Sequence, residues 1–260
     1  MYRKEGAGGS GISVATEGMN NANLLEKMLT YFQTRADSYA DAFATHIMIS
    51  VLCVGIACAV GIPLGIFCAK SKVARIFITG IFSTLRIVPS LAVLFICIPI
   101  FGTGLTPALV ALSFLAIPPV LINTTQAFAA IPQPVIETAE AMGMTNGMVF
   151  ARVKFPLATP LMLTGVKTAT VEVIASATLA AYIGAGGLGN IIFTGLGLLR
   201  PDLLIIGGAS VAALSIAADT LLSKFEKRLV RYRGTEIKRM PSGSVYGHAT
   251  GAMEIYGRLA

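Results

Sequence analysis

Glu172 is the side chain with the clearest capacity for chemistry, because it is a carboxylate inside the apolar run 160–183. It follows Pro160 by 12 residues, which is about 18 Å at a helical rise of 1.5 Å per residue. At that depth in a bilayer, an acidic side chain costs about 2.5–3.5 kcal/mol. We therefore expect Glu172 to face the protein interior, water or a partner. Two interpretations stay open: the wall of a path that attracts a quaternary ammonium, or an interhelical pair or a protonated, hydrogen-bonded acid.

Other charges also lie in the apolar runs, Arg86 inside 78–100 among them, and two of these charges carry expectations. Lys167 precedes Glu172 by five positions, about 140° around a helix, so it is a poor partner for Glu172 within that helix. Its long side chain is expected to reach the inner membrane interface. Asp219 lies close to the end of the last apolar run, and we expect it to pair with Lys224 or Lys227.

The elements that must position these charges are apolar helices. Of the 260 residues, 55% are hydrophobic and only 13% are charged, against about 25% charged in soluble domains. A helix needs roughly 20 apolar residues to cross the hydrocarbon core. Five runs qualify, 47–69, 78–100, 105–128, 160–183 and 201–222, whereas 190–200 is too short. The sequence therefore predicts an all-α membrane protein with about five transmembrane helices in one domain, 46–230.

The two ends of the chain differ from this domain. Residues 1–20 are polar and glycine-rich, so we predict a disordered tail, and no secretory signal peptide is visible. Apolar side chains in 21–45 fall near one helical face, which predicts an amphipathic helix. That helix either lies on the membrane surface or packs on the bundle. Residues 231–260 form a basic tail that is expected in the cytoplasm.

Positive charges indicate the orientation of the spans. They follow the first run, lie between the third and fourth runs, and follow the fifth run: Lys70, Lys72, Arg75, Arg152, Lys154, Lys224, Lys227 and Arg228. The opposite loops hold only Arg200. Because cytoplasmic loops are enriched in Lys and Arg, we predict the N-terminus outside and the C-terminus inside. The basic tail is then an orientation signal that contacts anionic lipid, and no basic-aromatic module suggests nucleic acid.

The remaining reactive side chains indicate no site. All four cysteines lie in apolar runs without a C-x-x-C pair, so we interpret them as small buried apolar residues: Cys53, Cys58, Cys68 and Cys97. His46 and His248 are isolated, and we assign them no chemistry and no metal.

The segment YIGAGGLGN (182–190) contains a G-x-G-x-x-G pattern formed by Gly184, Gly186 and Gly189, with Gly187 between them. A dinucleotide-binding turn needs a strand before these glycines and a helix after them. Here an apolar span precedes them and the predicted topology puts them outside, so nucleotide binding is not expected. The glycines are predicted to permit a sharp turn and close packing. A gate or re-entrant turn beside a wet path and a plain tight turn both stay open.

Prolines are predicted to interrupt the second and third runs, at Pro89, Pro99, Pro118 and Pro119. Broken helices often line transporter sites, so Pro89 is a candidate residue of the path. Asn123 follows the proline pair, and we expect it to satisfy backbone groups that the prolines leave free beside the path.

The polar stretch 132–158 is predicted to hang on the inner side as two short helices. Residues 134–142 suit the first helix, and Gly143 suits its C-terminal stop. A second helix is expected from about 146 to 155, ended by Pro156. An exposed apolar face on such a loop usually meets a partner.

This loop resembles the EAA pattern of membrane permease subunits of binding-protein-dependent ABC importers: E-A-A, three residues, G, nine residues, then I-x-L-P. The matching residues are Glu137, Ala139, Gly143, Val153, Phe155 and Pro156. Three positions depart mildly in size: Thr138, Val153 and Phe155. The resemblance implies a coupling helix that docks in a cleft of an ATPase subunit. Glu140 lies three positions after Glu137, on the same side of that helix.

Four more segments are similar to permeases for glycine betaine, choline, carnitine and related osmoprotectants: GIPLG (61–65), VPSLAVL (88–94), ATLAAYIGAGGLGNII (177–192) and ADTLLSKFEKRL (218–229). The likeness covers about 45–230 and implies a MetI-like permease fold, multi-pass in a bacterial inner membrane. It also implies partners: a second permease, identical or homologous, cytoplasmic ATP-binding subunits and an extracytoplasmic substrate-binding protein. ATP would be bound by a partner, and no cofactor is expected in this chain.

The absence of a motor motif agrees with these partners. The sequence contains no G-x-x-x-x-G-K-[ST] motif and no acidic metal cluster, so the driving energy must come from another polypeptide. With no Trp for an aromatic cage, strong solute selection is expected in the binding protein. Three alternatives remain: a methionine or sulfonate permease, a secondary transporter with Glu172 as its ion site, and a membrane enzyme. No nucleophile–base pair supports the enzyme.

Overall fold

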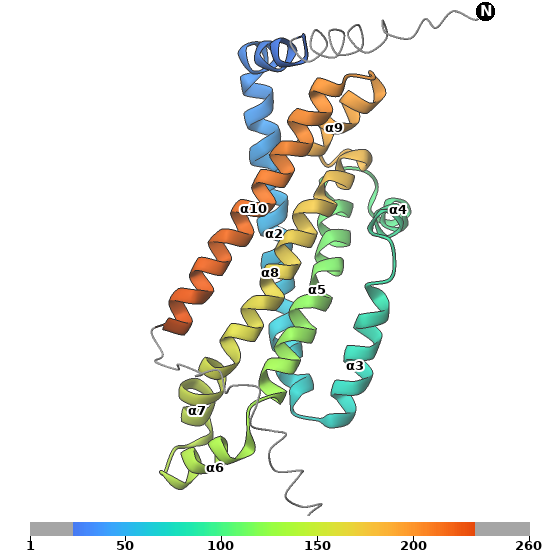
Figure 1. The fold of residues 1–260 in the computed structure, drawn as a ribbon. Helices are drawn as coiled ribbons and strands as arrows, with labels where there is room; N and C mark the ends of the chain where they lie inside the picture. The colour runs from blue at the N-terminus through green and yellow to red at the C-terminus, as the bar shows by residue number, and fades with distance from the viewer. Residues whose placement is uncertain (1–22, 232–260) are drawn as a thin grey trace, which may run out of the picture. The chain divides into compact units, whose positions relative to one another are not determined.

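The computed structural model describes residues 23–231, and most of them are helical (Figure 1). The described residues contain no strand, which confirms the predicted all-α class. The predicted tail 1–20 and nearly all of the basic tail 231–260 lie outside the described residues. The chain divides into two compact units, Met1–Glu226 and Lys227–Ala260, and the features below belong to the first, apart from the last residues of α10.

Four helical stretches are long and apolar enough to cross a membrane. They are α2 (Ala36–Ala69), α5 (Leu105–Ala129), the run containing α8 (Phe155–Ala180) and α10 (Pro201–Arg231). A bent pair of shorter helices makes five if it counts as one span, which agrees with the predicted number. α5 packs against both α2 and α8 through a core of mostly small and branched side chains, including Ile49, Ala57, Ala111, Val120, Ala169 and Ala177.

Glycines bring the backbones of these three helices close together. A Cβ atom on Gly65 of α2 would lie 2.7 Å from the Cβ atom of Thr124 in α5. A Cβ atom on Gly165 of α8 would lie 2.6 Å from the Cβ atom of Asn123 in α5. Small residues at such crossings strengthen van der Waals contact, which is a main source of helix association in lipid.

The second predicted span, 78–100, is not one straight helix. α3 (Lys72–Leu85) and α4 (Ser90–Phe101) meet at 90°, so α4 is seen end-on in Figure 1. Pro89 disfavours helical geometry at the preceding residue, and the chain breaks there.

The other prolines in the apolar runs do not break their helices. Pro99 lies inside α4, and both Pro118 and Pro119 lie inside α5. The prediction that prolines interrupt both spans is therefore correct at Pro89 and wrong at the other three positions. α5 remains one continuous helix because it packs between α2 and α8, although Pro118 and Pro119 lack backbone N–H donors.

The predicted amphipathic helix over 21–45 is divided in the structure. A helix over residues 23–34 ends at Arg35, and residues 36–45 already belong to α2. The first helix lies across the end of α2 (Figure 1). The predicted helix boundary near residue 45 is therefore wrong. The first span, α2, already starts at Ala36 and includes the polar residues up to position 41.

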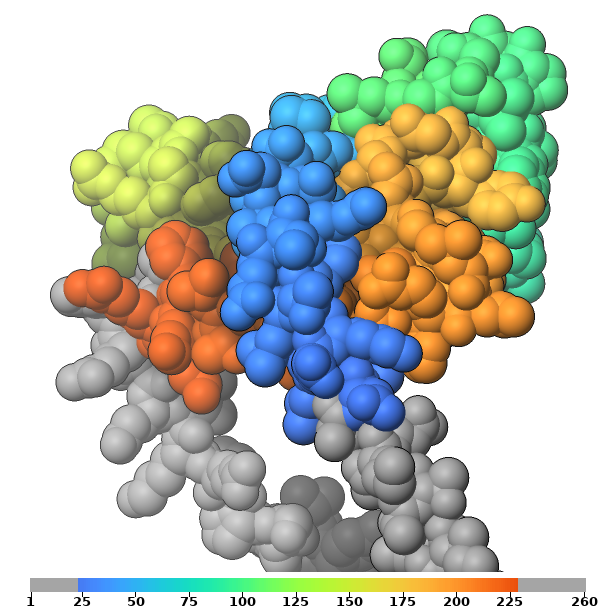
Figure 2. Space-filling view, turned by 90° about the horizontal axis from the view of Figure 1, so that it is seen from above, coloured from blue at the N-terminus to red at the C-terminus, as the bar shows by residue number. Residues whose placement is uncertain are grey.

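One face of the helix over 23–34 packs on the bundle. Met28 and Tyr31 contact a buried cluster from α9 (Leu188–Gly197) and α10, made of Leu188, Ile191, Leu203 and Ile206. Figure 2 shows the start of α2, in blue, beside this orange region. Leu25 and Leu29 remain exposed on another face. One side of this helix therefore packs on the bundle, and its position on the membrane surface stays a prediction.

Replacing Gly65 with alanine is expected to destabilise the protein by about 1–3 kcal/mol, because the new Cβ atom overlaps α5. Gly55→Ala on the same helix is the matched control, since its Cβ atom would meet nothing within 4 Å. Thermal unfolding of both variants in detergent measures the difference. Equal unfolding midpoints would contradict the close α2–α5 contact.

Candidate translocation cavity and coupling loop

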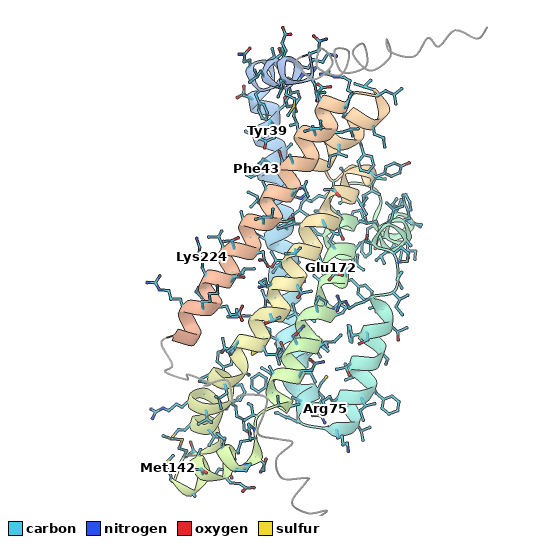
Figure 3. The ribbon with its side chains drawn as sticks, in the orientation of Figure 1. Tyr39, Phe43, Arg75, Met142, Glu172 and Lys224 are labelled. Carbon is cyan, nitrogen blue, oxygen red and sulfur yellow. The ribbon has the colours of Figure 1, made fainter. Side chains whose placement is uncertain are left out.

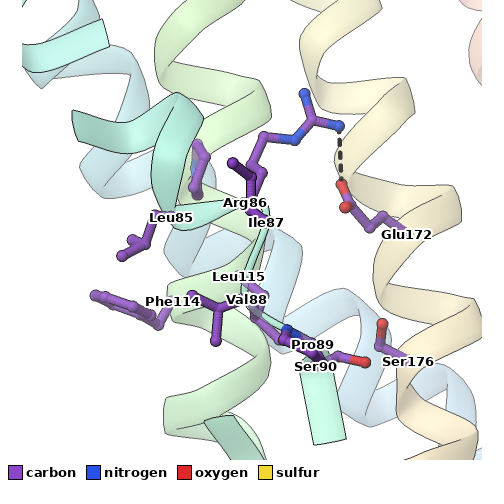
Figure 4. Close-up of a pocket in the computed structure, with 11 residues that line it drawn as sticks. Leu85, Arg86, Ile87, Val88, Pro89, Ser90, Phe114, Leu115, Glu172 and Ser176 are labelled. Atoms are coloured by element: carbon purple, nitrogen blue, oxygen red, sulfur yellow. Dashed lines mark ion pairs between the residues drawn. The ribbon is translucent and has the colours of Figure 1, made fainter. Parts of the chain in front are cut away.

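A cavity of about 250 Å³ lies where the α3–α4 break faces α5 and α8 (Figure 4). Figure 3 shows one of its residues, Glu172, in the middle of α8. The cavity is lined by Leu85, Arg86, Ile87, Val88, Pro89, Ser90, Phe114, Leu115, Pro118, Glu172 and Ser176. It therefore brings two of the predicted path residues, Pro89 and Glu172, to one place.

An ion pair crosses this cavity. The Nη2 atom of Arg86 lies 3.7 Å from the Oε2 atom of Glu172, and the two side chains are 39% and 40% exposed. That distance is too long for a hydrogen bond, and the buried Oε2 atom has no hydrogen-bond partner among the described residues. The structure thus shows the interhelical pair that was one interpretation of Glu172. Its role in a path stays a prediction.

The sequence analysis did not identify Arg86 as the partner of Glu172. Both residues are charges inside apolar runs, so the same signal marked both. Ser90 and Ser176 also line the cavity and were not predicted. Phe114 and Leu115 line it too, and their carbonyls lack the i+4 donor because positions 118 and 119 are prolines. Polar groups from α5 and α8 and from the α3–α4 break therefore surround a small space in an apolar bundle.

Asn123 does not belong to this cavity. Its Nδ2 atom donates a hydrogen bond to the carbonyl of Pro119 at 2.8 Å, and its Cβ atom lies at the Gly165 contact. The carbonyls that the two prolines leave without a helical donor belong to Phe114 and Leu115 instead. The predicted backbone partner is therefore wrong, and the observed role of Asn123 is at the α5–α8 contact.

A second ion pair joins α8 to α10. The Nζ atom of Lys167 lies 3.6 Å from Oδ1 of Asp219 and donates a hydrogen bond to Oγ of Ser223 at 2.9 Å. The prediction that Asp219 pairs with Lys224 or Lys227 is therefore wrong. That Lys167 reaches the membrane interface stays a prediction.

The glycine segment forms a tight connection between α8 and α9. Gly184, Gly186 and Gly187 all have φ between 83° and 85°, which only glycine adopts without strain. A Cβ atom on Gly189 would lie 2.1 Å from the carbonyl oxygen of Thr178. The predicted sharp turn and close packing are confirmed. A gating function for this turn stays a prediction.

Two contacts tie the glycine turn to neighbouring segments. The amide of Gly104 donates to the carbonyl of Ile183 at 2.7 Å. His46 is fully buried, its Nε2 atom lies 3.1 Å from the carbonyl oxygen of Ile174, and a Cβ atom on Gly187 would lie 3.1 Å from its Nδ1 atom. His46, to which no chemistry was assigned, is thus a packing partner of the turn.

The predicted coupling loop begins with α6 (Gln133–Ala141), and Gly143 follows its C-cap residue Met142 as the expected stop. Gly143 has φ +81°, its amide donates to the carbonyl of Glu140, and Met144 donates to Ala139. This is a Schellman motif, which satisfies the last carbonyls of the helix. Ala139 is buried inside the loop, whereas Glu137 and Glu140 are exposed. Figure 3 shows Met142 at the tip of the loop.

The second half of the loop runs directly into α8. α7 (Asn146–Val149) continues as a π-helical turn over Phe150–Lys154 and then as α8 from Phe155. Pro156 therefore does not end a helix, and that prediction is wrong. The wider π turn, closed by the Phe155 amide bonding the Phe150 carbonyl, lets a continuous helix pass the proline.

Aromatic contacts attach the loop to the spans. The rings of Phe128 and Phe150 stack with centroids 5.8 Å apart and planes 9° apart. The centroid of Phe155 lies 6.3 Å from that of Phe150. Val153 and Pro156 in the same segment are half-buried. Phe128 and Phe150 were missed, because nothing in the sequence shows that the end of α5 meets the loop.

This fold and loop belong to a known class. The family described as binding-protein-dependent transport system inner membrane component matches residues 61–231. Because that match covers more than half of the chain, the chain belongs to this family and is a multi-pass permease subunit of an ABC importer.

Several relatives within this class have named solutes. The carnitine transport permease protein OpuCB of Listeria monocytogenes is 38% identical over 79% of this chain and 94% of that protein. The choline transport system permease protein OpuBB of Bacillus subtilis (strain 168) is 35% identical with the same coverage. The solved inward-facing MetNI methionine ABC transporter has a TM-score of 0.61 at 23% identity, over 75% of this chain and 95% of that one. That structural likeness confirms the MetI-like fold.

Gly189→Ala is expected to disrupt the turn between α8 and α9, because the added Cβ atom would overlap the backbone of Thr178. Gly197→Ala on the same helix is the control, as its Cβ atom would meet nothing within 4 Å. The expected result is a lower unfolding midpoint and faster limited proteolysis at 184–190 for Gly189→Ala alone. Identical behaviour of the two variants would refute the close contact.

Proposed function

We propose that this permease imports osmoprotectants of the carnitine, choline and glycine betaine class. The similarity to carnitine and choline permeases carries the proposal, because it reaches 38% and 35% identity over 94% of each relative. The likeness to the methionine transporter is 23% and supports the fold alone, so methionine or a sulfonate is less well supported. Membership in a binding-protein-dependent family favours import driven by a separate ATPase over a self-contained carrier.

The α6–α7 loop is our proposed contact with the ATPase subunit. Its surface carries two exposed carboxylates, Glu137 and Glu140, next to the Met142 side chain, which is 68% exposed. Beneath that surface Ala139 and Val149 are buried, so the two short helices are held together as one body. A rigid surface of this kind can be pushed without collapsing, which coupling requires.

Motion of the loop would reach the cavity by two connections. The Phe128–Phe150 stack joins it to the end of α5, and the π turn joins it to α8 without a break. α5 and α8 contribute Phe114, Leu115, Pro118, Glu172 and Ser176 to the cavity. A tilt of the loop would therefore change the spacing between the cavity walls.

The surroundings of the permease follow from its exposed surfaces and charges. We propose that the loop faces the cytoplasm, with the N-terminus outside and the C-terminus inside, since Lys70, Lys72 and Arg75 lie in the turn that starts α3. α3 has no buried residue, and its exposed apolar side chains include Val73, Ile76, Phe77 and Ile81. Lipid and a second permease would cover such a surface, and a substrate-binding protein would dock on the outer face.

ATP-dependent uptake is the direct test of this function. The test uses proteoliposomes that contain the permease, its ATPase and its binding protein. They are expected to accumulate labelled carnitine or choline only when ATP is present on the side of the membrane that carries the ATPase. Methionine and taurine serve as control solutes. Uptake driven by an ion gradient without the ATPase would instead support a secondary transporter.

Glu137→Lys is expected to weaken assembly with the ATPase by about tenfold or more, because it reverses a charge at the proposed interface. The fold should survive, since Glu137 is exposed. Lys72→Glu, a charge reversal at the exposed start of α3, is the control. Co-purification and solute-stimulated ATP hydrolysis are measured. Normal coupling in Glu137→Lys would exclude this face of α6 as the contact.

A further inference from the structure

We propose that the cavity at the α3–α4 break binds a zwitterionic solute, with Arg86 taking its carboxylate and Glu172 taking its cationic group. This inference rests on the proposed function and specifies the solute chemistry of the path. Carnitine and glycine betaine have both charges, whereas choline has only the cation.

Arg86 and Glu172 can each exchange their present contact for one with a ligand. Their closest atoms are 3.7 Å apart, and no hydrogen bond holds either side chain among residues 23–231. A guanidinium offers five N–H donors, and its planar fork fits a carboxylate with two parallel bonds. A ligand carboxylate would therefore give Arg86 better geometry than Glu172 now gives it.

Charge balance favours a ligand with both signs. A cation alone would satisfy Glu172 but draw it away from Arg86, which would leave the guanidinium without its partner. An anion alone would leave Glu172 unpaired in the same way. A zwitterion inserted between the two side chains keeps every charge next to its opposite.

The shape and lining of the cavity agree with a small ligand of this kind. Its volume of about 250 Å³ is below the range of roughly 300–1,000 Å³ that is usual for drug-sized ligands. Phe114 also lines the cavity, on the side away from Glu172 (Figure 4). Ser90 and Ser176 also line the same space and carry hydroxyl groups.

Thermal stabilisation tests binding without requiring transport. The purified permease–ATPase complex, without binding protein, is heated in the presence of carnitine, choline chloride or sodium chloride at equal concentrations in the tens of millimolar. Binding to the native state raises the unfolding midpoint, so we expect a rise of about 1–4 °C with carnitine and none beyond the salt control with choline. An equal rise with choline and carnitine would overturn the proposal.

Variants locate that binding. Arg86→Gln and Glu172→Gln are expected to abolish the carnitine shift, and Arg86→Lys to retain part of it. Lys167→Gln removes the other transmembrane ion pair, which lies outside the cavity, and should leave the shift intact. If Lys167→Gln also lost the carnitine shift in unfolding midpoint, the ion pairs would act only by stabilising the bundle, and the proposed binding in the cavity would be refuted. The wild-type comparison of carnitine with choline decides the matter even if a variant does not fold.

Uptake gives a second, independent measurement. In proteoliposomes, Arg86→Gln is expected to lower carnitine uptake about tenfold or more relative to choline uptake. Equal losses for both solutes would contradict a role in recognising the carboxylate. If the wild-type system transports neither solute, the proposed function fails, while the thermal shift with carnitine still tests the cavity.

Discussion

Close contact between helix backbones is the constraint on which the other features of the first unit depend. Gly61 and Gly65 of α2 and Gly165 of α8 let both helices approach α5 to within van der Waals distance. Lipid offers no hydrophobic force that would hold helices together, so such contacts have to hold the bundle. Because α5 is fixed on two sides, it stays continuous through Pro118 and Pro119 and forms a stable wall for the cavity.

The two charges of α8 are matched by charges on other elements. α8 provides Lys167 and Glu172, and these pair with Asp219 of α10 and with Arg86 at the end of α3. Both pairs cost less in an apolar environment than four separate charges would. Movement of α8 would therefore change two ion pairs with different neighbours, one in the cavity and one in the C-terminal half of α10.

Local patterns were predictable from the sequence, and contacts between distant segments were not. The apolar runs indicated the spans, and Gly143 and the glycines at 184–189 indicated turns, because length and backbone conformation are local properties. The effect of a proline was not predictable, since Pro89 sits at a break and Pro118 lies within a packed helix. The ion-pair partners and the Phe128–Phe150 stack also escaped prediction, because they depend on which helices become neighbours.

The π-helical turn over Phe150–Lys154 sets the rotational phase of the coupling loop about the axis of α8. Each residue of an α-helix advances the chain by about 100°, so one residue more or fewer would swing the loop to another side of the bundle. A π turn takes up one extra residue within a wider ring. The number of residues in this turn therefore fixes the direction in which Glu137 faces.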